Sequence, residues 1–317
     1  MTSPDPRFSS LLPTLQTQVN SSSLGPFKQC PRRYYYEIVR GLRTRERQID
    51  LEFGTLFHTF TEHYDRLRLG GEPHSHALES TIELALRATW NSELHRPMVF
   101  DHSQKNRMGL IRTLVWYLDR YGENDLELLI LPDGSPALEL SFAFDSGYAS
   151  QETGEPIQFI GKLDKLVRLN DKIYILDRKT TRSGLGTRYF ERYSPDNQFS
   201  LYSLAGRIIC SLEVQGLIAD AVQVGMDFSR FERALVPRPL EILEEWLFEA
   251  TSWWLPFMDR CASEGYWPQN DKSCGLYGGC PFREVCSMRP GARETWLERS
   301  FVVKGSGSDG LLEDKAA

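Results

Sequence analysis

The 317-residue sequence predicts an α/β fold, in which a mixed β-sheet is flanked by helices and follows a helical N-terminal part. Three observations support this class. Apolar residues recur at helical spacing over about residues 50–125. Between residues 136 and 180 the spacing instead becomes that of strands separated by turn residues. A helix, a strand and a further helix come next, and this mixed order is typical of an α/β core.

The elements can be placed in order along the chain. Helices are expected at 51–70, from about residue 76, and at 107–121, because apolar residues recur every three or four positions. Strands are expected at 136–145, 157–169 and 172–180, with Asn170-Asp171 forming a tight hairpin between the last two. The later elements are a helix at about 195–210, a strand at 220–229 and a helix at about 240–258.

Composition predicts one large domain between two less ordered ends. Residues 1–24 are expected to form a flexible segment, and residues 304–317, "KGSGSDGLLEDKAA", a disordered tail. The single domain spans residues 25–303, with a helical part at about 50–125, a core at about 136–230 and a cysteine loop at 270–290.

Charge and hydropathy restrict the partners. No apolar run is long enough to span a bilayer and the N-terminus lacks a signal-peptide pattern, so we expect a cytoplasmic protein without a membrane partner. The formal net charge is −6, which by itself argues weakly against nucleic acid. Arginine-rich stretches at 30–47 and 177–193 nevertheless suggest a phosphate-backbone track, although for any single arginine a solvated surface position is the simpler interpretation.

Two aspartates and a lysine form the first candidate site. Asp177 and Lys179 are two apart on one expected strand, so they share a face, and the hairpin brings Asp164 close to them. Carboxylates are the ligands that Mg²⁺ prefers, and a lysine beside them could orient a water for phosphodiester hydrolysis. The D-x-K tripeptide alone is common, but a charged pair that ends the apolar run "IYIL" must face a cleft or a partner.

Two helices add further candidates. His58 lies beside the apolar stripe of the helix at 51–70, where a histidine is more often a core or boundary residue than a ligand, and Glu62 could pair with it. Gln198 and Tyr202 are four apart on the helix at 195–210 and share one face, outside its expected core side of Leu201, Leu204, Ala205 and Ile208.

Four of the six cysteines form a pattern. Cys274, Cys280 and Cys286 have the spacing C-x5-C-x5-C in a glycine-rich loop, and Cys30 lies far upstream. Four thiolates could hold zinc or an iron–sulfur cluster. The remaining two, Cys210 and Cys261, are expected to be buried as small apolar side chains.

Five blocks in this order resemble the RecB-type PD-(D/E)xK nucleases, and in particular the subgroup with an iron–sulfur cluster, such as AddB-like, CRISPR-adaptation and phage exonuclease domains. They are "FKQCPRRYYYEIVRGL", "FGTLFHTFTEHY", "IGKLDKLVRLNDKIYILDRKTT", "DNQFSLY" and "CGLYGGCPFREVC". The resemblance covers about residues 25–290 and implies a restriction-endonuclease-like mixed sheet flanked by helices.

The resemblance also implies a role for each candidate residue. It makes His58, Asp164 and Asp177 the ligands of Mg²⁺ or Mn²⁺ and Lys179 the catalytic lysine, with Gln198 and Tyr202 beside the scissile phosphate. Cys30, Cys274, Cys280 and Cys286 would bind a 4Fe-4S cluster. Many relatives have C-x2-C-x5-C, so the spacing found here leaves zinc as an alternative. Arg178 should point to the opposite strand face, and Glu139 is either an accessory acid or part of a structural salt bridge.

The function expected is a metal-dependent DNA exonuclease in DNA recombination, repair or processing, with a structural cluster. One alternative is a non-catalytic DNA-binding subunit of a recombination or CRISPR-adaptation complex that keeps the nuclease fold. Another is a zinc-stabilised scaffold without a nucleic-acid role. Polarity, strand preference and oligomeric state depend on the shape of the folded molecule and do not follow from these motifs.

Overall fold

A computed structural model describes residues 5–45, 48–98, 100, 102–122, 126–276 and 279–303. The chain divides into two compact units. The terminal unit comprises Met1–Arg47, Ala143–Gly161 and Glu244–Ala317, and the central unit comprises Gln48–Phe142 and Lys162–Leu243. The predicted single domain at 25–303 stays a prediction, and the tail at 304–317 lies outside the described residues.

Strands of the central unit form a mixed sheet in the order β7-β8-β9-β10, and β5 and β6 also pair with β7. β7 with β8 and β9 with β10 are antiparallel, whereas β8 with β9 is parallel because α6 and α7 cross between them. The strands are β5 Glu127–Leu128, β6 Leu138–Ala149, β7 Pro156–Leu169, β8 Lys172–Thr181, β9 Val214–Val224 and β10 Ser229–Pro237. A short hairpin is formed by β3 Trp90–Asn91 and β4 Arg96–Pro97.

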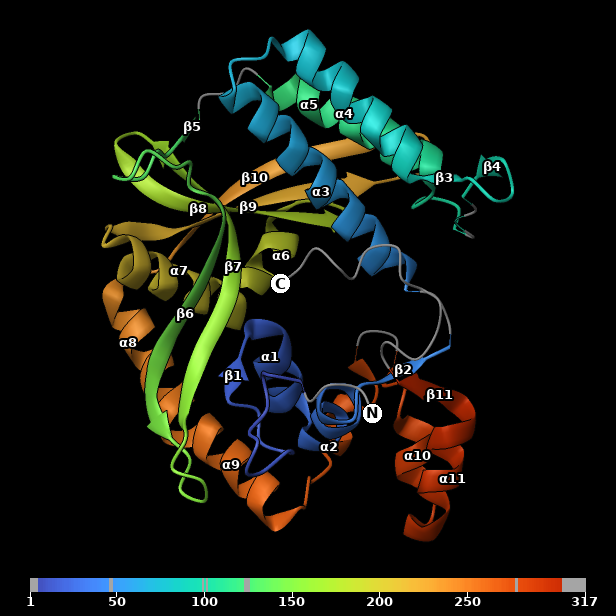
Figure 1. Cartoon of the computed structure of the whole chain (residues 1–317), viewed down its shortest axis with the longest axis vertical. Helices are drawn as coiled ribbons and strands as arrows, with labels where there is room; N and C mark the ends of the chain where they lie inside the picture. Colours follow the sequence, from blue (N-terminus) through green and yellow to red (C-terminus); the bar gives the residue numbers. More distant parts are fainter. Residues whose placement is uncertain are drawn as a thin grey trace. The chain divides into compact units, whose positions relative to one another are not determined.

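Helices cover both faces of these strands (Figure 1). On one face lie α3, α4 and α5, whose apolar side chains form a core with Val222 and Val224 of β9. On the other face α7 packs against β8 and β9. The helices are α3 Ile49–Leu69, α4 His74–Ala88, α5 Arg107–Tyr121, α6 Thr187–Phe190, the short 3-10 turn η2 Glu191–Tyr193 and α7 Asn197–Cys210. The predicted mixed sheet flanked by helices is thus confirmed.

The terminal unit is largely helical. Its short strand β1 pairs in parallel with the first part of β7, and β2 pairs with β11. Its elements are β1 Gln18–Val19, α1 Ser21–Gln29, α2 Pro31–Tyr34, the π turn η1 Tyr35–Val39, β2 Leu42–Thr44, α8 Leu240–Glu249, the π turn η3 Ala250–Trp254, α9 Leu255–Glu264, η4 Asp271–Ser273, α10 Arg283–Ser287, α11 Pro290–Ser300 and β11 Phe301–Val303. Residues 5–24, expected to be flexible, include the fully buried Leu15 and Val19 and the capping box of Asn20 and Ser23.

Two element predictions were wrong. The strand expected at 220–229 is two strands, because residues 225–228 turn back with a hydrogen bond from Gly225 N to Phe228 O. The prediction also placed the start of β9 too late, because Gly216 and Asp220 are residue types that are uncommon in strands. Both nevertheless lie within this almost entirely buried strand. The helix expected at 240–258 continues to Glu264 through the π turn η3. This turn ends at Trp254, two residues before Pro256, which lacks the N–H needed for a regular helical bond. No helix within the described ranges is long and apolar enough to cross a membrane.

Candidate active site

The antiparallel pair β7 and β8 brings the two predicted aspartates together. Their hairpin turns at Asn170 and Asp171, whose φ values of 49° and 59° are those of a two-residue turn that suits the twist of the strands. The register pairs Lys165 with Leu176, so Asp164 and Asp177 are the next residues on each strand. The backbone N–H of Arg178 donates to Asp164 Oδ2 at 2.9 Å.

Asp177 and Lys179 lie on one face of β8, as predicted. Lys179 Nζ is 2.8 Å from Asp177 Oδ2 and 3.1 Å from Oδ1. The Asp177 side chain is 2% exposed, whereas that of Lys179 is 30% exposed. The ammonium group therefore lies between the buried carboxylate and the surface.

Arg178 points to the other face, as the strand alternation predicted, and is almost fully buried there. Its guanidinium donates to Asp65 Oδ2 of α3 at 2.7 Å and to the Tyr117 hydroxyl of α5 at 3.1 Å. Tyr117 in turn donates to Asp220 of β9 at 2.6 Å, and Lys165 also pairs with Asp65. This buried network fixes the strand that carries Asp177 and Lys179 against α3 and α5.

His58 of α3 reaches the same strands. Its Nδ1 is 3.3 Å from Asp164 Oδ2, and its Nε2 is 2.9 Å from the Arg178 carbonyl oxygen. The suggested pairing with Glu62 is wrong, because Glu62 instead forms an ion pair with Arg66 one turn further along the helix. Burial lowers the pKa of His58 and favours the neutral imidazole, which is the form that binds metals.

Helix α7 presents Gln198 and Tyr202 to this group. The helix begins after Asp196, whose side chain accepts a hydrogen bond from Phe199 N at 2.8 Å. Burial raises the pKa of Tyr202, while its hydrogen bond with Gln198 lowers it, and the charges of Asp177 and Lys179 also act on it. The predicted core side of α7 was wrong at one position: Leu201, Leu204 and Ala205 are buried, but Ile208 is 47% exposed.

The charges of the site influence one another. Burial raises the pKa of Asp177 to about 7, even though the ammonium of Lys179 acts in the opposite direction. Burial opposes the charge of Lys179, but the two aspartates outweigh it and raise the pKa of Lys179. The lysine therefore stays an ammonium. A further positive charge near Asp177 would stabilise the ionised form of its carboxylate.

The donor set suits a hard divalent cation. It consists of the carboxylates of Asp164 and Asp177, the imidazole of His58 and the carbonyl oxygen of Arg178. In this structure these donors bond to one another and to Lys179. Across the described ranges, no group of three or more His, Cys, Asp or Glu side chains is arranged to hold a metal ion. The Lys179 ammonium donates its hydrogen bond to Asp177 Oδ1. The other oxygen, Oδ2, is in ion-pair contact with Lys179 but is buried without a hydrogen bond.

Two further acidic residues form ion pairs near these strands, and only the first was considered from the sequence. Glu139 pairs with Lys162 at 2.6 Å, which is the structural salt bridge considered for it, and its backbone has a left-handed φ of 53°. Asp65 was not predicted at all. It lies seven residues after His58 on α3 and so shares its helix face. This spacing could have predicted that Asp65 faces the sheet, but not that its partner is Arg178.

The four predicted cysteines all belong to the terminal unit and to the described residues, and their thiols are not arranged to hold a metal ion in this structure. Cys280 interacts electrostatically with Cys274 and Cys30, and Cys286 interacts with Cys280 and Cys30. Cys30 Sγ accepts a hydrogen bond from Asn270 N at 3.3 Å, and Cys280 N donates to the Cys274 carbonyl at 3.0 Å. Burial raises the pKa values of the Cys280 and Cys286 thiols, so without a metal they hold their protons. Residues 277 and 278 of this loop lie outside the described residues.

The first arginine-rich stretch is mostly engaged in internal contacts. Arg32 donates to Trp267 O, Arg33 pairs with Glu37, and Arg40 pairs with Glu294, while Arg47 lies outside the described residues. In the second stretch Arg178 is buried in the network described above. These contacts provide structural roles for Arg32, Arg33, Arg40 and Arg178, four of the arginines that the sequence had suggested as a phosphate track.

Comparison with known proteins places this geometry in a family context. The model of the PD-(D/E)XK nuclease superfamily matches residues 18–287. Among solved structures, a "Putative exonuclease" from Eubacterium rectale shares 11% identity at a TM-score of 0.49, covering 87% of this chain and 91% of its own. The structure of SSO0001 shares 14% identity at a TM-score of 0.35, covering 86% of each chain. No curated protein matches the chain. Both structural scores are too low to add to the family assignment.

Proposed function

Because the chain belongs to the PD-(D/E)XK nuclease superfamily, we propose that it is a DNA exonuclease that hydrolyses phosphodiester bonds with Mg²⁺ or Mn²⁺. One observation carries the proposal: His58 of α3, Asp164 of β7 and Asp177 with Lys179 of β8 form a linked group through contacts of 2.8 to 3.3 Å. Burying a carboxylate as deeply as Asp177 costs free energy, and such sites are typical of catalytic centres.

Each residue has a task in this reaction. The carboxylates of Asp164 and Asp177, the imidazole of His58 and the carbonyl of Arg178 would hold the cation. When bound, it lowers the pKa of a water molecule and neutralises charge on the phosphate. Lys179, held beside Asp177, orients the attacking water and stabilises the charge that develops on the phosphate.

Gln198 and Tyr202 complete one wall of the site. They project from the first turns of α7, and the Tyr202 hydroxyl lies within the electrostatic influence of Asp177, Lys179 and Asp164. An amide and a phenol are neutral hydrogen-bond donors, so they can contact a phosphate without competing for the cation. We assign them to positioning the scissile phosphate.

For the cysteines we propose a structural 4Fe-4S cluster, bound by Cys30, Cys274, Cys280 and Cys286. Its support is the contact between two distant chain segments, in which Cys30 Sγ accepts a hydrogen bond from Asn270 N at 3.3 Å, four residues before Cys274. The cluster would join the start of the terminal unit to its last loop. We propose that such an enzyme acts with protein partners in DNA recombination, repair or CRISPR adaptation.

The decisive experiment compares cleavage of linear DNA labelled at the 5′ or 3′ end, and of circular DNA, with Mg²⁺ or Mn²⁺. Asp177→Asn and Lys179→Ala should each lower the cleavage rate by at least about a hundredfold. Matched controls come from the hairpin between β7 and β8: Asp171→Asn makes the same chemical change in a turn that accepts asparagine, and Lys172→Ala removes a solvent-exposed lysine.

Shortening of linear DNA from an end, with circular DNA left intact, is the expected pattern. Cutting of circular DNA at the same rate would make the protein an endonuclease. Full activity in both Asp177→Asn and Lys179→Ala would contradict the site, and binding of DNA without cleavage by the unmodified protein would favour a non-catalytic subunit.

A further inference from the structure

The exposed face of α5 carries a row of alternating apolar and cationic side chains. Met108, Arg112, Trp116 and Arg120 are spaced four apart, so they lie on one face of the helix. Met108 is 71% exposed and Trp116 is 42% exposed. The Arg112 guanidinium lies over the Trp116 ring at 5.7 Å. This row takes no part in the site described above.

The β9–β10 hairpin continues the pattern beside α5. Its turn, residues 225–228, exposes 61% of Met226 and 41% of Phe228, and the Arg230 guanidinium lies 5.1 Å over the Phe228 ring. The hairpin is fixed to the helix because Arg112 donates to the carbonyl oxygens of Met226 and Gly225 at 2.5 and 2.7 Å. The two rows therefore form one surface, which we call the α5–hairpin surface.

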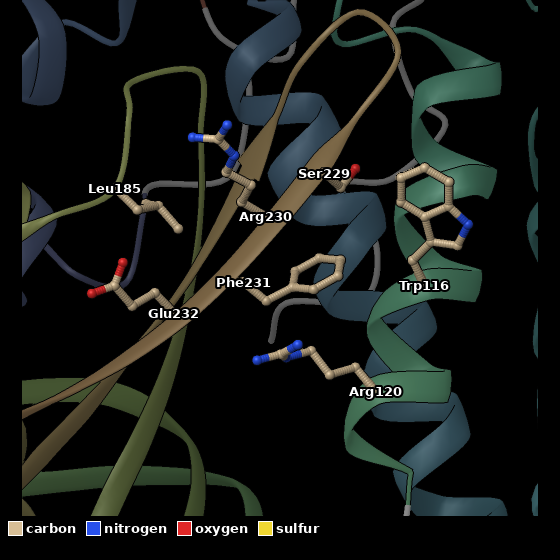
Figure 2. A pocket seen from close by; sticks show the side chains of 7 residues that line it. All are labelled: Trp116, Arg120, Leu185, Ser229, Arg230, Phe231 and Glu232. Carbon is tan, nitrogen blue, oxygen red and sulfur yellow. The ribbon is translucent and has the colours of Figure 1, made fainter.

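An open cavity of about 490 Å³ lies along this surface (Figure 2). Figure 2 shows Trp116 and Arg120 on α5, with Arg230 and Glu232 pointing from β10 towards Leu185. Phe231 and Ser229 complete the lining. Among the residues that the structure describes, no carboxylate forms an ion pair with Arg120 or Arg230. The cavity thus offers aromatic surface and two arginines, which lie over aromatic rings and not against carboxylates, beside one glutamate.

We propose that the α5–hairpin surface binds a segment of single-stranded nucleic acid. Proteins that bind single strands stack unpaired bases on exposed aromatic rings and place arginines against the phosphates. Trp116 and Phe228 provide the rings, and Arg120 and Arg230 provide the cations. A duplex keeps its base faces stacked inside, so it cannot use these rings in the same way.

The position of the surface agrees with this role. The parallel pairing of β8 and β9 sets Lys179 opposite Ala221, and the hairpin turn begins four residues later at Gly225. At the usual rise of a strand this is about 13 Å along the sheet. The Asp177 and Lys179 side chains lie on the face of β8 away from α5, so a strand bound at the candidate active site would pass around the β9–β10 end of the sheet to reach this surface. The inference rests on the proposed nucleic-acid substrate and adds its single-stranded form.

Binding is best measured on the full-length chain carrying Asp177→Asn, with chelator present, so that DNA stays intact. The probe is a fluorescent oligodeoxythymidylate of about 20 nucleotides. Trp116→Ala and Arg230→Ala should each weaken binding about tenfold, whereas Trp116→Phe should keep most of the affinity because it retains a ring. Trp253→Ala, which removes a tryptophan that is 67% exposed in the terminal unit, is the control and should bind normally.

The same substitutions should weaken binding of a blunt duplex of the same length by less than twofold. In the otherwise unmodified protein, Trp116→Ala should raise the KM for a long single strand and leave kcat within about twofold. Equal single-strand affinity in Trp116→Ala, Arg230→Ala and the control would overturn the proposal, as would an equal loss for the duplex. Loss of cleavage on Asp177→Asn tests the active site separately, so the two proposals fail by different results.

Discussion

At the scale of single residues, Arg178 separates the two faces of β8, the strand that carries Asp177 and Lys179. Its backbone carbonyl and N–H contact His58 and Asp164, whereas its side chain is buried on the opposite face against Asp65 and Tyr117. One residue thus joins the candidate metal ligands to the packing of α3 and α5.

Replacing Arg178 by methionine should destabilise the protein, because Asp65 would lose its closest partner while staying buried. Breaking a buried ion pair costs about 3–5 kcal/mol, and we expect the low end, about 3 kcal/mol, since Lys165 still pairs with Asp65. Urea unfolding measures the change. The triple variant Arg178→Met, Asp65→Leu and Lys165→Met, which leaves no member of this ion-pair group unpaired, should recover part of the loss, and no recovery would argue against this explanation.

Gln198 provides a test of function separate from stability. Its side chain is half-buried and forms a hydrogen bond with Tyr202. It does not belong to the apolar side of α7 that packs in the core. Gln198→Ala should therefore lower kcat about tenfold or more and leave the free energy of unfolding within about 0.5 kcal/mol. Leu201→Ala, which removes an apolar side chain from the fully buried side of the same helix, should have the reverse effect: a loss of about 2–5 kcal/mol in unfolding free energy with kcat little changed. If Gln198→Ala instead unfolds the protein, the role of Gln198 is structural, in the core packing of α7.

At the scale of elements, the start of α7 decides where Gln198 and Tyr202 lie. The Asp196 carboxylate caps the helix through Phe199 N. Asp196→Ala should cost about 1 kcal/mol in unfolding free energy, whereas Asp196→Asn keeps an acceptor and should cost only a few tenths. Equal losses in the two variants would show that charge, not capping, is what Asp196 contributes.

At the scale of the whole molecule, the proposed cluster would join the two ends of the terminal unit. Cys30 belongs to its first segment, and Cys274, Cys280 and Cys286 belong to its last. Anaerobically purified protein should contain about four iron and four sulfide per chain and be brown. Cys280→Ala should lose this iron and lower the thermal midpoint, while Cys210→Ala, outside the group, should keep it. A colourless protein with one zinc per chain would contradict the cluster.

The sequence by itself determined most elements and the candidate site. Helical spacing placed α3 and α5 within two residues of their bounds, and the Asn170-Asp171 hairpin set the register that brings Asp164 to Asp177. These predictions succeed because the periodicity of side chains and the turn chemistry are local properties. The elements missed were those without such a pattern, such as α1 and the short pairs β2 and β11.

Only the tertiary structure decided which distant residues meet. Asp65, Tyr117 and Asp220 lie far apart in the sequence, yet they surround the Arg178 side chain, and the α5–hairpin surface joins two elements with no shared motif. The periodicity of an element tells which side of it is buried, but not which neighbour covers that side. The partners of a buried charge follow from the packing of helices on a sheet, which arises from contacts distributed over the whole unit.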